Sequence, residues 1–158
     1  GENGGTSDKG LELAITGSVP MVEGLDVGVG YYDQDTDATV TTGNYGQQEG
    51  TAYIKYSTGP VSVGYQRGVV SVDGATSNTM YDNRMIGISY KISDDLSVSY
   101  GTNPIETVGS TDQDSVAVGV SYTMGSLGIS FSMNQVDNIA HSATNDREAY
   151  QLGLSFAF

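Results

Sequence analysis

The sequence is poor in cysteine, tryptophan, histidine and basic residues. Its 158 residues include no cysteine, no tryptophan and one histidine. The lack of cysteine suits an oxidising compartment, where a free thiol would be a liability. Lysine and arginine number 6 against 19 aspartates and glutamates, which gives a formal net charge of −13. This acidic balance argues against a nucleic-acid partner, since binding to nucleic acid requires basic patches.

Long hydrophobic runs are also missing. A membrane-spanning helix needs about 20 consecutive apolar residues, and no run in this chain comes close to that length. The mean hydropathy of −0.23 at first suggests a soluble chain. A membrane β-barrel, however, needs apolar residues at only about half of its strand positions, so a low mean hydropathy does not exclude one.

What the chain has instead is alternation. Large apolar residues recur at every second position in nine segments, and no segment shows sustained 3.6-residue periodicity. Successive side chains of a strand point to opposite faces, so each segment has one apolar face and one polar face. The pattern predicts an all-β antiparallel fold with essentially no helix. The nine segments are residues 10–19, 25–33, 50–58, 61–70, 83–92, 96–103, 115–124, 127–135 and 149–158.

The connections between these segments alternate in length. Tight turns follow the third, fifth and seventh segments, whereas about ten to sixteen polar residues follow the second, fourth, sixth and eighth. Short turns at one end and long loops at the other are typical of an outer-membrane β-barrel. A soluble β-sandwich is the alternative, but it distributes its loop lengths less regularly.

The face opposite the apolar residues carries mostly small side chains. About two-thirds of its positions are glycine, alanine, serine or threonine, as at Gly64, Gly87, Ser99 and Gly119. A narrow eight-stranded barrel must fill its interior with side chains, whereas a sixteen-stranded barrel leaves an aqueous channel. Thin residues cannot fill a narrow barrel, so the pattern favours the wall of a wide, water-filled one.

The last nine residues carry a more specific signal. Large apolar residues occupy every second position up to a terminal phenylalanine: Tyr150, Leu152, Leu154, Phe156 and Phe158. Aromatic residues favour the membrane–water boundary at both rims of a membrane barrel. This tail resembles the C-terminal assembly signal of bacterial outer-membrane β-barrels. The hairpin at residues 87–101 resembles those of general diffusion porins, especially the alphaproteobacterial ones.

The resemblance to porins implies a fold, a location and a set of partners. Members of that family are homotrimers of sixteen-stranded barrels in the outer membrane of Gram-negative bacteria. They contact membrane lipid and lipopolysaccharide, depend on the barrel assembly machinery, and pass small hydrophilic solutes and ions through a constriction. The resemblance therefore predicts a passive channel that requires no cofactor. The alternative is a structural or adhesive barrel whose acidic loops bind a partner.

The number of strands suggests that the barrel continues beyond this chain. Nine strands would leave the two ends of the chain on opposite sides of the membrane, whereas bacterial barrels have an even strand count. We therefore expect residues 1–158 to be a single barrel domain that is incomplete at its N-terminus, the C-terminal part of a sixteen-stranded barrel. The family's constriction loop would then lie in the missing part. A closed nine-stranded barrel is the alternative.

Charged residues on the strands are candidates for the pore lining. Four charged residues fall on the same face as the small residues: Lys55, Lys91, Glu12 and Asp26. A charge in the middle of a strand is tolerable when it faces water but costly when it faces lipid. Arg67 alternates with apolar residues instead, so either its strand has left the apolar band at this point or a bulge changes the face before residues 69–70. Arg84 shares the alternation of Ile86, and we expect it at the outer rim. Solvation of the rim and lumen would explain all these charges equally well. The full set of candidates is Lys55, Lys91, Arg67, Arg84, Glu12, Asp26, Tyr53 and Gln66.

Metal and enzyme chemistry have weaker support. Asp33, Asp35 and Asp37 place three carboxylates at alternate positions, as at the start of a Ca²⁺ loop, but the glycine and distal glutamate of an EF-hand are missing. A solvated acidic rim is the simpler interpretation, with calcium as the alternative. His141 lies in a polar loop with no catalytic motif around it, and we interpret it as a surface residue. We therefore expect the protein not to be an enzyme.

Overall fold

The computed structural model describes residues 9–35, 46–72 and 79–156 and contains ten β-strands and one short 3-10 helix. The strands and the helix run in the order β1 (Lys9–Ser18), β2 (Leu25–Asp35), β3 (Gln47–Thr58), β4 (Val61–Val72), β5 (Thr79–Lys91), β6 (Leu96–Thr102), β7 (Ile105–Thr107), β8 (Asp114–Met124), β9 (Leu127–Asp137), η1 (Ile139–His141) and β10 (Arg147–Phe156). The expected all-β fold is confirmed.

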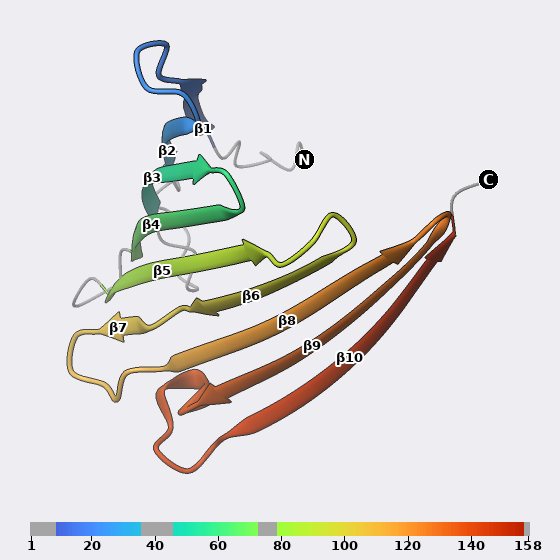
Figure 1. Ribbon diagram of the computed structural model, residues 1–158. Helices are drawn as coiled ribbons and strands as arrows, with labels where there is room; N and C mark the ends of the chain where they lie inside the picture. The colour runs from blue at the N-terminus through green and yellow to red at the C-terminus, as the bar shows by residue number, and fades with distance from the viewer. Residues whose placement is uncertain (1–8, 36–45, 73–78, 157–158) are drawn as a thin grey trace, which may run out of the picture.

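All ten strands belong to one antiparallel sheet. Neighbours along the chain pair with one another in the order β1-β2-β3-β4-β5-β6-β8-β9-β10, and β7 pairs with β5 beyond the end of β6. Figure 1 shows the sheet as a single curved and twisted layer. Within the described residues the sheet is open, because β1 pairs with β2 alone and β10 with β9 alone.

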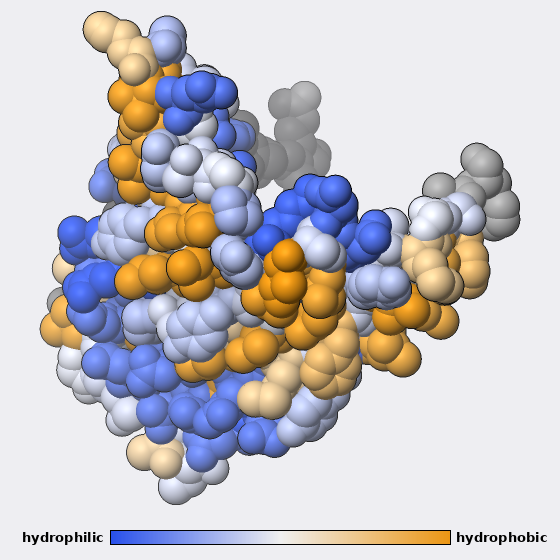
Figure 2. Space-filling view, viewed as in Figure 1, coloured by the Kyte–Doolittle hydropathy of each residue, from blue (hydrophilic) through white to orange (hydrophobic). Residues whose placement is uncertain are grey.

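The register sorts the side chains into two faces. On the first, which we call the apolar face, large side chains are exposed, and no hydrophobic residue among those described is buried. Patches of this apolar surface are visible in Figure 2. The described part of the sheet therefore has no buried hydrophobic core of the kind found in soluble proteins. Representative members are Leu13, Val29, Ile54, Tyr65, Ile86, Ile88, Val118, Phe131, Leu152 and Leu154.

The second face, which we call the polar face, carries the thin residues. Gly64 lies opposite Lys55 and Gly87, and Ser99 lies opposite Ser89 and Gly119. In the central part of the sheet the alternation follows the pattern that the sequence predicts.

Glycines with positive φ occur in several of the connections between strands. Gly59 and Gly125 have φ of 52° and 59° in the turns after β3 and β8. Gly24, with φ of 81°, ends the β1–β2 connection, and an added Cβ there would lie 1.9 Å from the carbonyl oxygen of Ser57. Glycine is therefore required where this connection packs against the end of β3.

The sheet also departs from the expectation in two respects. It has ten strands rather than nine, because residues 105–107 form the short strand β7. Several strands extend beyond the apolar alternation, since β3 begins at Gln47 and β5 at Thr79. Backbone pairing continues where the side chains are already polar.

None of the described residues forms a helix long and apolar enough to cross a membrane.

Candidate functional site: the polar face

The polar face is organised in rows that cross the strands. One row runs from Lys55 through Gly64, Gly87 and Gly101 to Ala117. Its neighbour toward the tight turns is a row of hydroxyls, formed by Ser57, Ser62, Ser89 and Ser99. The row toward the long loops has larger side chains, with Tyr53, Gln66 and Met85 side by side.

These three rows border a hollow of about 540 Å³ in the polar face. The glycine row forms its floor because glycine adds no side chain, and an added Cβ at Gly87 would meet no atom within 4 Å. Serine hydroxyls line one side, and Tyr53 and Gln66 line the other. The arrangement leaves open space over the middle of the sheet.

Tyr53 is held in place by Gly28 on the neighbouring strand. The two residues are direct partners in the β2–β3 register. A Cβ at Gly28 would lie 2.2 Å from Tyr53 Cε1, and Gly28 is itself buried. The ring therefore lies against the backbone of β2 and turns its other face away from the sheet.

The predicted charges of the thin face do lie on it. Lys55 Nζ is 3.8 Å from a carboxylate oxygen of Asp26, and Ser18 Oγ donates to Asp26 at 2.6 Å. Lys91 Nζ is 3.3 Å from Asp94 in the following turn. Both ammonium groups stay about half exposed, with side-chain exposures of 55%. They form two separate pairs near the tight-turn end, so the face carries balanced charge there.

Glu12 and Gln66 complete the set on the polar face. Glu12 lies opposite Tyr32 at the long-loop end of β1 and β2. Gln66 Nε2 donates to Thr51 Oγ1 at 3.2 Å, so the Gln66 side chain lies along the surface of the sheet. The sheet therefore places Lys55, Lys91, Glu12, Asp26, Tyr53 and Gln66 on one face, and their role in a pore lining stays a prediction.

Arg67 and Arg84 lie on the opposite face. They are partners in the β4–β5 register and share the face of Tyr65 and Ile86. The β3–β4 register runs without a break from Thr58↔Val61 to Gln47↔Val72, so no bulge turns Arg67 inward. The register therefore excludes the bulge interpretation, and we leave both arginines out of the proposed pore lining.

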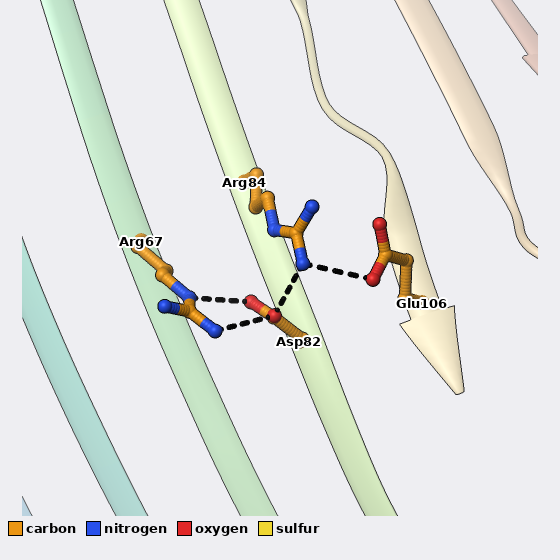
Figure 3. A network of polar contacts seen from close by, with 4 residues as sticks. All are labelled: Arg67, Asp82, Arg84 and Glu106. Atoms are coloured by element: carbon orange, nitrogen blue, oxygen red, sulfur yellow. Dashed lines mark hydrogen bonds and ion pairs between the residues drawn. The ribbon is translucent and has the colours of Figure 1, made fainter. Parts of the chain in front are cut away.

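The two arginines join three strands through an ion-pair network, drawn in Figure 3. Arg67 donates to both carboxylate oxygens of Asp82 at 3.0 and 2.8 Å. Arg84 Nη2 lies 2.8 Å from Asp82 Oδ2 and 2.8 Å from Glu106 Oε2 on β7. Two cations and two anions thus neutralise one another beside the apolar residues, and they tie β7 to β5 at the long-loop end.

The predicted calcium ligands are only partly described. Asp33 and Asp35 lie at the long-loop end of β2, opposite Leu11 and Lys9, whereas Asp37 lies outside the described residues. In the part of the chain that the structure describes, no group of three or more histidine or acidic side chains is placed to hold a metal ion. Calcium binding by this segment stays a prediction.

The terminal strand presents its alternating residues on the apolar face. Tyr150, Leu152, Leu154 and Phe156 have exposed fractions of 61–69%, and the Tyr150 ring stacks on Phe131 with centroids 6.4 Å apart. Phe158, the last residue of the predicted assembly signal, lies outside the described residues.

One residue that the sequence analysis set aside has a structural role. The His141 ring lies between Thr107 Oγ1, at 3.0 Å from Nε2, and the Thr111 carbonyl oxygen, at 2.9 Å from Nδ1. These partners are 34 and 30 residues away in sequence, so no local pattern could have indicated them.

Comparison with solved structures supports the barrel fold. The chain is similar to OmpT, an outer membrane protein of Vibrio cholerae folded in vitro, with a TM-score of 0.67 and 15% sequence identity. The match covers 94% of this chain and 55% of the OmpT chain, so this chain spans about half the length of that structure. No curated protein sequence matches the chain.

The same match corrects one expectation. The absence of a catalytic motif around His141 predicts that the protein is not an enzyme. The likeness to OmpT overturns this prediction. The fold is common to outer membrane proteins that are only 15% identical in sequence, so it does not exclude enzymatic activity. A shared fold does not specify whether a member is catalytic.

The family comparison covers the whole chain. The family model described as Gram-negative porin matches residues 1–158. The open antiparallel sheet, its exposed apolar face and the likeness to an outer membrane protein agree with that match. Together they place the protein in the lipid of the outer membrane of a Gram-negative bacterium. The chain belongs to the Gram-negative porin family.

Proposed function

We propose that the polar face lines a water-filled channel through which small hydrophilic solutes and ions diffuse passively. The observation that carries this proposal is the hollow with a glycine floor and serine hydroxyls along one side. Water and hydrated solutes have room over such a surface because its side chains are short, and the serine, glutamine and tyrosine groups at its borders can form hydrogen bonds with them.

The apolar face supplies the complementary half of the argument. Its exposed aliphatic and aromatic side chains are favourable against lipid and unfavourable against water. The two faces alternate residue by residue along every strand, so the sheet can separate lipid from water across its own thickness.

The two edge strands of the described sheet, β1 and β10, are relevant to the width of the complete barrel. In lipid, each unpaired backbone donor or acceptor costs several kcal/mol, so spanning sheets are closed. We propose that β1 and β10 each pair with further strands in a wider barrel, for which sixteen strands is the number that the porin resemblance implies. The homotrimer implied by the same resemblance stays a prediction.

The charge pattern supports weak rather than strict selectivity. Lys55 is paired with Asp26, and Lys91 with Asp94, so neither sign dominates the tight-turn end of the polar face. A solute in the hollow meets a largely apolar floor bordered by hydroxyl, amide and phenol groups, which can form hydrogen bonds with many hydrophilic molecules.

Single-channel recording in planar bilayers tests the proposal. We expect the purified protein to give ohmic, weakly selective steps. Gly87→Tyr should reduce the conductance, because it adds a ring to the floor of the hollow. Gly50→Tyr is the matched control: a Cβ meets no atom within 4 Å at either glycine, but Gly50 lies on the apolar face.

Two results would contradict the proposal. One is a folded, membrane-inserted protein that gives no current steps, which would favour the structural or adhesive alternative. The other is an equal loss of conductance in both tyrosine variants, because the hollow would then not be part of the conduction path.

A further inference from the structure

The connection between β9 and β10 has an unusual backbone. Asn138, Ala140 and His141 have φ of 57°, 55° and 62°, a region that residues with side chains seldom adopt. Three such residues within four positions require surroundings that hold them in place. Those surroundings come from the preceding long connection, between β6 and β8.

The His141 ring is the centre of these contacts. Because the Thr111 carbonyl can only accept a hydrogen bond, Nδ1 of the ring carries the proton and donates to it at 2.9 Å. In the neutral ring Nε2 is then an acceptor, and Thr107 Oγ1 donates to it at 3.0 Å. Thr107 is buried to 9% exposure beneath these contacts.

Two further contacts join the same two connections. Asn138 Nδ2 donates to the Asp112 carbonyl oxygen at 2.9 Å. The Ala140 backbone N–H donates to Gln113 Oε1 at 3.1 Å. In both contacts the donor residue has the left-handed backbone conformation. This conformation and the two hydrogen bonds therefore depend on each other.

This arrangement lies on the polar-face side of the sheet. Thr107 is the register partner of Tyr81, which lies on the polar face of β5 together with Asn83 and Met85. The His141 ring centroid is 5.9 Å from that of Tyr81. Glu106, the neighbour of Thr107, contacts Arg84 on the apolar face, as alternation requires. The β9–β10 connection therefore reaches across β8 and β7 to β5 over the polar face.

We propose that residues 138–146 form a constriction at the long-loop mouth of the channel, and that His141 is the positioning residue that holds them there. The proposal rests on the proposed function, because it needs the polar face to be the lumen. It assigns the constriction to a connection in this chain, at the mouth rather than at mid-height.

Removing the histidine contacts tests the role of His141. In planar bilayers, His141→Ala should raise the single-channel conductance and admit neutral polyethylene glycols larger than those that enter the wild-type channel. Thr107→Val should shift both readouts in the same direction, since it keeps the size of the side chain and removes its hydroxyl. Thr144→Ala, at an exposed position of the same connection, is the matched control and should leave both readouts unchanged.

Rescue separates positioning from general structural damage. His141→Gln keeps an amide that can donate and accept hydrogen bonds, so it should return the conductance and size limit toward wild type. Wild-type values in His141→Ala and Thr107→Val would overturn the proposal. So would a Gln variant that behaves like the Ala variant.

A second pair of substitutions covers failure of the alanine variant to fold. Because the chain has no cysteine, Thr107→Cys with His141→Cys introduces its sole thiols. A short bis-methanethiosulfonate cross-linker should lower the conductance of this double variant to the wild-type value, and a reductant should raise it again. Equal conductance before and after cross-linking would overturn the constriction. In that case a conducting wild type leaves the channel function intact, whereas a silent wild type overturns both proposals.

Discussion

An arginine placed on either side of β8 should report which face meets lipid. Val118 lies near the middle of this strand on the apolar face, with 41% exposure. Ala117 precedes it, points to the polar face and borders the hollow. Val118→Arg and Ala117→Arg therefore add the same side chain one residue apart, to opposite faces.

The magnitude follows from the environment of each side chain. An arginine on the lipid face of a membrane barrel costs about 2–4 kcal/mol near the bilayer midplane, whereas one facing water costs little. Since about 1.4 kcal/mol is a factor of ten, Val118→Arg should lower the folding equilibrium constant about 30- to 700-fold. Ala117→Arg should leave it nearly unchanged, because the glycine floor beside Ala117 leaves space for the longer side chain.

Urea unfolding in lipid vesicles measures this difference. The chain has no tryptophan, so the folded fraction is better followed by gel mobility without heating than by intrinsic fluorescence. With a urea dependence of about 2 kcal/mol per molar, the midpoint of Val118→Arg should fall by about 1–2 M. A larger loss in Ala117→Arg than in Val118→Arg would refute the assignment of the faces.

Two other predictions concern single residues. Gly28→Val should lower the urea midpoint, because its side chain would occupy the place of the Tyr53 ring, and adding Tyr53→Ala should restore much of the loss; an unchanged midpoint would contradict the packing of Tyr53 on β2. Deleting Phe158 should reduce the amount of heat-modifiable protein in the outer membrane while synthesis continues, because the predicted assembly signal loses its terminal aromatic; normal levels would show that this residue is not needed.

The strands and their faces could be read from the sequence because alternation is a local property. The segment predicted at residues 127–135 is β9 (Leu127–Asp137), and its alternating residues share one face as expected. The tail is similar: Tyr150, Leu152 and Leu154 follow one another on the apolar face of β10. A one-residue error in register would have exchanged the two faces everywhere.

What the sequence did not predict depends on pairing between distant residues. β7 has three residues, too few to show a period, and is recognised by its pairing with residues 81–83 of β5. The place of Arg67 followed from the unbroken β3–β4 register, which the sequence alone could not distinguish from a bulge. His141 contacts residues 30 and 34 positions away, so its loop position suggested a solvated side chain.

A cysteine scan along β9 tests the central claim, that one face of this sheet meets water and the other meets lipid, most directly. Single cysteines at positions 128 to 133, in a chain that has none of its own, would be treated in intact membranes with a water-soluble maleimide. We expect labelling at Gly128, Ser130 and Ser132, and protection at Ile129, Phe131 and Met133, because these sets lie on the polar and apolar faces. Uniform labelling, uniform protection or labelling of the apolar set would contradict the account.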